Sequence, residues 1–249
     1  MATIVTAYFN IPKSKANHET YALWMQNMLA IQNRMIVFCD ASSVELIISL
    51  RKSLPTIIVE TRFEEFYCYK YIDIFREQYE IDHEKDVHSV ELYLIWNEKS
   101  NFLKKSIEIE QQISNDNNNR KYVWCDIGCF RTPNTLFLKW PDAQKIPDDR
   151  MLLLEVDPLN SSEEPSVLPD LTLKNYIGGT IFAGSSQAIF KWHDAYYNML
   201  ERLYAMGRFV GKDQTIMSSV YIEQPELCHC VKYPCEYYDR WFYLQDYLL

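Results

Sequence analysis

The fold is decided by three short apolar runs: TIVTAY at Thr3–Tyr8, MIVFC at Met35–Cys39 and PTIIVE at Pro55–Glu60. Their length and their content of Ile, Val and aromatic residues are typical of buried strands. Between them lie two segments, Thr20–Leu29 and Ser43–Arg51, whose apolar residues recur at helical spacing. This alternation of strand and helix predicts parallel strands covered by helices, and therefore an α/β fold.

The rest of the chain continues both patterns. Further strands are expected at Tyr122–Asp126 and Met151–Val156, and helices at Phe66–Gln78, Val90–Gln112, Ser186–Met206 and Asp213–Tyr221. A Pro-, Ser- and Glu-rich loop between Asp157 and Asp170 has the composition of either a lid or a plain connection. With 249 residues and no long linker, we expect one domain over residues 1–249, with its aromatic end, residues 233–249, docked on the core.

Composition and charge exclude several classes of protein. The formal net charge is −9 with 25 Lys and Arg residues, so the chain lacks the basic surplus of a general nucleic-acid binder. No apolar run approaches the ~20 residues that span a bilayer, and the N-terminus lacks the basic and apolar regions of a signal peptide. The seven cysteines are an odd number, and several lie in apolar runs, which favours reduced thiols and a cytoplasmic location.

The six glycines all lie between Gly128 and Gly211. Their absence from the first strand–helix turn excludes a dinucleotide-binding Rossmann fingerprint, which needs glycines there. The run GTIFAGSS at Gly179–Ser186 approaches a phosphate-binding P-loop, but Ser185 stands where that motif needs its lysine. Backbone geometry that requires glycine is therefore expected between Gly128 and Gly211.

One strand end carries a candidate ligand. The run WCDIGCFR at Trp124–Arg131 places Asp126 directly after an apolar strand, and ligands of open α/β sheets bind beyond the carboxyl ends of strands. A carboxylate there suits a divalent metal that bridges phosphates, and Arg131 can face an anionic group. Asp126 is equally compatible with a simple turn cap.

The other candidates each have a structural alternative. Gly178 and Gly179 allow the backbone to approach a ligand closely, or form a tight turn. Asp213 is either a helix cap or a general base, and Lys99 either reaches an anion or is solvated. The run CHCVKYPC at Cys228–Cys235 lacks the two separated pairs of a zinc site, which leaves His229 as a candidate single ligand.

Taken together, these segments resemble a known family. The motifs are TAYFN at residues 6–10, LYLIWNEK at 92–99, WCDIGCFR at 124–131, the glycine pair at 178–179 and GKDQ at 211–214. This combination resembles the HtrL/YibB-like family, which looks like a branch of the GT-A glycosyltransferases. The resemblance implies a GT-A-like, Rossmann-like fold with a mixed, mostly parallel sheet flanked by helices.

The resemblance also implies roles for the donor-binding residues. Thr6, Ala7 and Tyr8 would hold the nucleotide with Asp40 beside them, and Lys99 and Lys232 would face its phosphates. Gly178, Gly179 and Gln214 would line the sugar pocket.

A metal and a base are implied in the same way. Asp126 stands where GT-A enzymes carry a D-x-D metal motif, although Gly128 replaces the second Asp. His229 resembles the C-terminal His that completes the metal site in some of these enzymes. The resemblance therefore implies a divalent metal, manganese, as the cofactor, and Asp213 as the base or hydroxyl-orienting residue.

The expected activity is transfer of a sugar from a nucleotide-sugar donor, a UDP- or GDP-sugar, to a glycan or other acceptor. A metal or a Lys or Arg group must neutralise the departing diphosphate in such a reaction. The incomplete D-x-D pattern favours an alternative, a non-catalytic protein that binds nucleotide sugars or glycans on the same fold.

Overall fold

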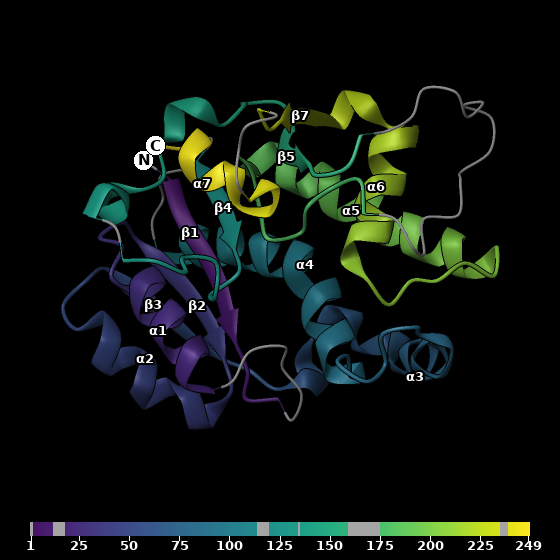
Figure 1. The fold of residues 1–249 in the computed structure, drawn as a ribbon, viewed down its shortest axis with the longest axis horizontal. Coiled ribbons are helices and arrows are strands. Elements are labelled where there is room, and N and C mark those ends of the chain that lie inside the picture. The colour runs from purple at the N-terminus through teal and green to yellow at the C-terminus, as the bar shows by residue number, and fades with distance from the viewer. Residues whose placement is uncertain (1, 12–17, 114–119, 134, 159–174, 235–238) are drawn as a thin grey trace.

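Seven strands form one sheet in a computed structural model that describes residues 2–11, 18–113, 120–133, 135–158, 175–234 and 239–249 (Figure 1). The strands are β1 (Ala2–Tyr8), β2 (Met35–Cys39), β3 (Thr56–Glu60), β4 (Lys121–Cys125), β5 (Met151–Glu155), β6 (Ile181–Ser185) and β7 (Cys228–Lys232). Their order across the sheet is β3-β2-β1-β4-β6-β5-β7.

The sheet is mixed and mostly parallel, as expected. β1 pairs in parallel with β2 and β4, β2 with β3, and β5 with β7. Only β6 runs against its neighbours, β4 and β5. The carboxyl ends of β1, β2, β4 and β5 therefore lie at one edge of the sheet, where parallel α/β sheets place their ligands.

Helices cover both faces of this sheet. They are α1 (His18–Leu29), α2 (Val44–Arg51), α3 (Ile72–Ile81), α4 (Val90–Ile113), α5 (Ser186–Ala205), α6 (Asp213–Glu223) and α7 (Tyr243–Tyr247). Alternate strand residues point to opposite faces. Val5 and Trp124 pack with the helices α3 to α6, whereas Ile4 and Val123 pack with α1, α2 and α7.

The helical stretch predicted at Phe66–Gln78 has two parts in the structure. Tyr67–Tyr71 forms a 3₁₀-helix, and the α-helix begins at Ile72. The backbone N–H groups of Tyr67 and Cys68 donate to the buried carboxylate of Glu98 at 2.9 and 3.0 Å. This contact with α4 holds the segment in its tighter turn.

The end of the chain packs against the α1 and α2 face. Leu244 and Leu248 are fully buried there, and the indole N–H of Trp140 donates to the Gln245 carbonyl at 3.0 Å. In the part of the chain that the structure describes, no helix is both long and apolar enough to cross a membrane.

The predictions for the Asp157–Asp170 loop and for the cysteines can be compared with the structure only in part. Most of the Asp157–Asp170 loop and Cys235 lie outside the described residues. The other six cysteines are free thiols, in line with the expected reduced state.

Candidate functional site

A cavity of about 590 Å³ opens at the carboxyl ends of β1 and β4. Ala7 and Tyr8 line it from β1, and Asp126 to Cys129 line it from the turn after β4. Lys99 of α4 and Gln214 of α6 also contribute. The cavity therefore lies at the carboxyl ends of parallel strands, where the position of Asp126 in the sequence predicts a ligand site.

Lys99 joins the two predicted aspartates. Its Nζ lies 3.1 Å from Asp126 Oδ1 and 2.9 Å from Asp213 Oδ2. The same ammonium donates to the Gly179 carbonyl at 2.9 Å. Residues from α4, the β4 turn, the glycine pair and α6 thus meet at one buried cation.

The two carboxylates of this cluster face different surroundings. The side chain of Asp126 is 36% exposed, whereas that of Asp213 is 6% exposed. The indole N–H of Trp124 also donates to Asp126 Oδ1 at 2.8 Å, which leaves Oδ2 without a partner among the described residues. Asp126 borders the cavity and Asp213 lies behind Lys99, away from the cavity wall.

Burial and charge shift the pKa values within the cluster. Burial alone would lower the pKa of Lys99, but the charges of Asp126 and Asp213 outweigh it and raise that pKa above its usual value. Burial raises the pKa of Asp126, and the Asp213 charge adds to this, against the opposing effect of Lys99. The ammonium is therefore firmly protonated at neutral pH, and Asp126 holds a proton more readily than an ordinary aspartate.

The glycine pair makes room for this arrangement. A Cβ on Gly179 would lie 2.5 Å from Asp213 Oδ2, closer than non-bonded atoms approach. Gly179 is thus required by the carboxylate beside it, and its carbonyl serves Lys99. Gly178 donates its N–H to the Leu154 carbonyl at 2.9 Å and lies outside the cavity wall.

Asp213 does not cap its helix. Lys212 holds the N-cap position of α6, and Asp213 is the first residue inside the helix. Its Oδ1 accepts from the N–H of Gln214 at 2.9 Å, and Oδ2 contacts Lys99. The cap interpretation is therefore wrong, because the side chain turns inward toward the cluster.

Of the four residues expected near the nucleotide at β1 and β2, two line the cavity. They are Ala7 and Tyr8, whereas Thr6 is fully buried within β1. Asp40 follows β2 and accepts from the N–H of Asn10 at 2.8 Å, and Ser42 and Ser43 donate to its other oxygen. Asp40 thus braces the chain that leaves β1.

His229 and Lys232 lie elsewhere. Both belong to β7, the edge strand, which β6 and β5 separate from β4. His229 is opposite Leu152 in the register, and Lys232 pairs with Glu155 at 3.5 Å. Neither residue lines the cavity at Asp126.

The described residues do not fit a metal held by Asp126 and His229. Lys99 and Trp124 already occupy Asp126 Oδ1, and His229 lies on a distant strand. Among the described residues, no three or more His, Cys, Asp and Glu side chains gather closely enough to hold a metal ion. Divalent metals of this kind take several oxygen ligands, and the described residues around Asp126 do not supply them.

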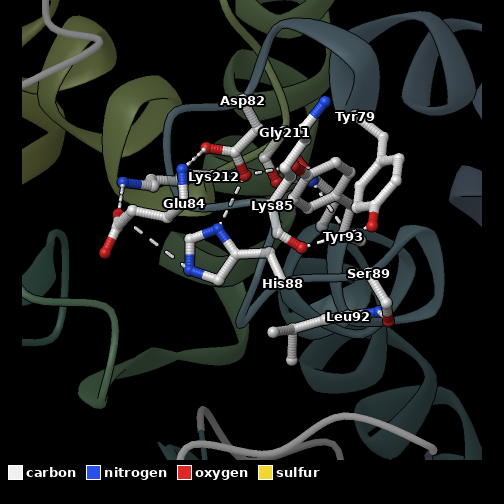
Figure 2. A network of polar contacts seen from close by, with 11 residues as sticks. Tyr79, Asp82, Glu84, Lys85, His88, Ser89, Leu92, Tyr93, Gly211 and Lys212 are labelled. Atoms are coloured by element: carbon white, nitrogen blue, oxygen red, sulfur yellow. Dashed lines mark hydrogen bonds and ion pairs between the residues drawn. The ribbon is translucent and has the colours of Figure 1, made fainter.

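Sequence reasoning missed a second polar network at the cavity (Figure 2). His88 Nδ1 lies 2.7 Å from Asp82 Oδ2, and Tyr93 donates to the same oxygen. Glu84 pairs with Lys212, and His88 Nε2 is 4.0 Å from Glu84. Glu84, His88 and Lys212 all line the cavity. Lys212 belongs to the GKDQ motif, but no sequence pattern connected it to Glu84 or His88.

Aromatic side chains form much of the remaining wall. They come from the start, middle and end of the chain and comprise Tyr8, Phe9, Tyr21, Trp24, Trp96, Trp124, Trp241 and Phe242. The available signal was the high aromatic content of 14%. Rings of this kind offer flat apolar faces to a base or a sugar.

Comparisons with known proteins identify the family of the chain. No curated protein shows significant similarity to it. Among solved structures, the apo form of mouse xyloside xylosyltransferase 1 is 12% identical over 93% of this chain and 85% of that chain, with a TM-score of 0.46. A likeness this distant supports no argument about the reaction. A family model described as "Bacterial protein of unknown function (HtrL_YibB)" matches residues 1–245. The chain therefore belongs to the HtrL_YibB family.

Proposed function

We propose that this protein is a glycosyltransferase that uses a nucleotide-sugar donor. The observation that carries the proposal is the cavity at the ends of β1 and β4, with Asp126 and Lys99 on its wall and Asp213 paired to Lys99 behind them. A volume of about 590 Å³ is within the range of small-molecule sites. The resemblance of the motifs at Asp126 and Asp213 to GT-A enzymes supplies the reaction class.

The transfer makes definite demands on these residues. The bond between the anomeric carbon and the diphosphate oxygen breaks, and a bond from the acceptor oxygen to that carbon forms. Electrons pass to the departing diphosphate, and the acceptor hydroxyl loses its proton. The site must therefore bind the sugar hydroxyls, supply positive charge to the diphosphate and accept a proton.

Asp126 is the carboxylate best placed to meet a substrate. Its Oδ2 has no partner among the described residues, and its side chain is 36% exposed at the cavity. Lys99 and Trp124 fix the other oxygen, so the carboxylate is oriented before a ligand arrives. We propose that Asp126 accepts a hydrogen bond from a hydroxyl group of the donor sugar. Asp213, on the far side of Lys99, orients that lysine.

The role expected of Asp213 as general base remains a prediction that the variant Asp213→Asn tests. A base must reach the proton that it removes, directly or through one water. If Asp213 is the base, the variant loses roughly 10²-fold or more in transfer rate while donor affinity holds. If Asp213 only orients Lys99, donor affinity and stability change together with the rate.

A donor panel tests the function itself. Purified protein is incubated with UDP-, GDP- and CDP-sugars, and release of the nucleoside diphosphate is measured with water as the acceptor, with manganese and with EDTA. We expect release from one nucleotide class, and a loss of roughly 10²-fold in Asp126→Asn. Asp73→Asn, at an exposed position of α3, is the matched control.

The outcomes separate enzyme from binding protein. Binding of a nucleotide sugar without release of its diphosphate would favour the non-catalytic alternative. The absence of both binding and release across the panel would contradict the proposal. If release of the nucleoside diphosphate required manganese, a metal would take part in the reaction although the described residues form no ligand set for it.

A further inference from the structure

The cations on the described cavity wall differ in whether a carboxylate already neutralises them. Lys99 is shared between Asp126 and Asp213, and Lys212 pairs with Glu84. Arg131 also lines the cavity, yet no described carboxylate lies within ion-pair distance of it. Arg131 is therefore the cation whose charge is left for a ligand.

Aromatic rings hold the Arg131 side chain in place. Its Cζ lies 4.7 Å from the centroid of the Trp24 ring and 4.5 Å from that of Phe242. The rings come from α1 and from the C-terminal segment, so the tertiary fold brings them to Arg131. A guanidinium packed against ring faces keeps its N–H donors in its own plane, and these donors form no hydrogen bond with any described residue.

The backbone before Arg131 is fixed from the same two sides. Asn27 of α1 donates its Nδ2–H to the Phe130 carbonyl at 2.9 Å. Gln245 of α7 donates its Nε2–H to the Cys129 carbonyl at 2.8 Å. The side chain and its backbone are thus positioned before a ligand binds, which lowers the entropic cost of binding.

We propose that Arg131 binds the diphosphate of the nucleotide-sugar donor, with Trp24 and Phe242 holding its guanidinium in position. The identity of the donor rests on the proposed function. The planar fork of a guanidinium matches two phosphate oxygens and forms strong charge-assisted hydrogen bonds. In this assignment Arg131 supplies positive charge at a site where the described residues offer no metal-ligand set.

Titration calorimetry tests this assignment in the presence of EDTA, with UDP, GDP, CDP, ADP and inorganic pyrophosphate as ligands. We expect Arg131→Gln to weaken binding of the preferred nucleoside diphosphate by roughly 10- to 100-fold, as loss of a hydrogen-bonded charge implies. Arg131→Lys recovers part of the affinity, because it keeps the charge but not the fork. Trp24→Leu weakens binding by a smaller factor while Arg131 remains.

Arg150→Gln is the matched control, because Arg150 is exposed, pairs with Asp149 and precedes β5 at the opposite edge of the sheet. Thermal melting of every variant verifies that the fold is retained. Equal affinity of wild type and Arg131→Gln for a nucleoside diphosphate overturns the inference and leaves the proposed function standing. If pyrophosphate binds in an Arg131-dependent way but no nucleoside diphosphate binds, Arg131 forms an anion site and the proposal of a nucleotide-sugar donor is contradicted. No binding of any ligand overturns both.

Discussion

At the scale of single residues, the molecule is centred on one buried ammonium. Lys99 is 5% exposed and neutralises part of the charge of Asp126 and Asp213, which come from segments far apart in the chain. A buried ion pair contributes little compared with an apolar core, but removal of one partner leaves the other charge buried and uncompensated. The cluster is thus sensitive to the loss of its lysine.

We predict that Lys99→Met destabilises the protein by about 3–5 kcal/mol, because the buried carboxylate of Asp213 and the partly exposed one of Asp126 lose their common partner. The folded pKa of Lys99 lies above its unfolded value, so its contribution is fully present below about pH 10 and is lost as the pH rises through the folded pKa. The difference between wild type and variant should therefore stay constant from neutral pH to mildly alkaline pH.

Urea unfolding across that range measures the difference. Lys105→Met, on the same helix and half-buried, is the control and should cost much less. A cost equal to that of the control would show that Lys99 is not the partner on which the two aspartates depend.

The sequence indicated most residues of this cluster, but it did not predict that they contact one another. Asp126 was predicted from its place after a strand, and the contact from Trp124 to Asp126 follows from residues two apart on one face of the chain. Lys99 could not be assigned to either aspartate, because its meeting with Asp213 depends on how α4 and α6 pack. Arg131 was noted, whereas the rings that hold it come from opposite ends of the chain.

At the scale of elements, the connection between α3 and α4 is stabilised by Asp82 (Figure 2). Its Oδ2 accepts from Tyr93 and lies 2.7 Å from His88 Nδ1, while Oδ1 accepts from the N–H of Glu84 at 2.9 Å. Burial would raise the pKa of Asp82, but these hydrogen bonds outweigh it and lower the pKa below its usual value. The ionised carboxylate therefore fixes one end of the cavity wall.

We predict that Asp82→Asn lowers the free energy of unfolding by about 1–3 kcal/mol at neutral pH, because buried donors lose their common acceptor. The folded pKa of Asp82 is depressed, so its contribution is present above the unfolded value of about 4 and is lost as the pH falls through the folded value. The difference from wild type should shrink in acid. Denaturant unfolding from pH 7 down to pH 3 measures it.

Asp73→Asn, at an exposed position on α3, is the control for this measurement. A difference between wild type and Asp82→Asn that stays constant down to pH 3 would contradict the assigned role of the ionised carboxylate.

The elements themselves were largely predictable, and their exceptions have physical causes. The N-terminal strands and helices follow directly from the alternating pattern, which reports local burial. Within the predicted helical stretch, Tyr67–Tyr71 forms a 3₁₀-helix whose backbone binds Glu98, a contact with a distant element. No local pattern contains that information.

At the scale of the whole molecule, the cavity is lined by residues from both the first strand and the C-terminal segment. Ala7 and Tyr8 of β1 lie on its wall together with Trp241 and Phe242. The parallel sheet was predictable, but its order is not, because β6 and β5 are inserted between β4 and β7. That insertion is what separates His229 and Lys232 from Asp126.

The aromatic C-terminal segment is anchored by its leucines rather than by its rings. Leu244 is fully buried in the core beneath α1 and α2, whereas Trp241 is half-buried at the cavity. We predict that Leu244→Ala costs about 2–5 kcal/mol, the usual effect of truncating a buried leucine, because the cavity it leaves is closed on all sides. Trp241→Ala should cost less, since its ring already contacts solvent, but should weaken binding of the nucleoside diphosphate found in the donor panel. Urea unfolding and calorimetry on both variants separate the two roles. Equal losses of stability would mean that the rings and the leucines anchor the segment together, and an unchanged affinity in Trp241→Ala would remove that ring from the ligand site.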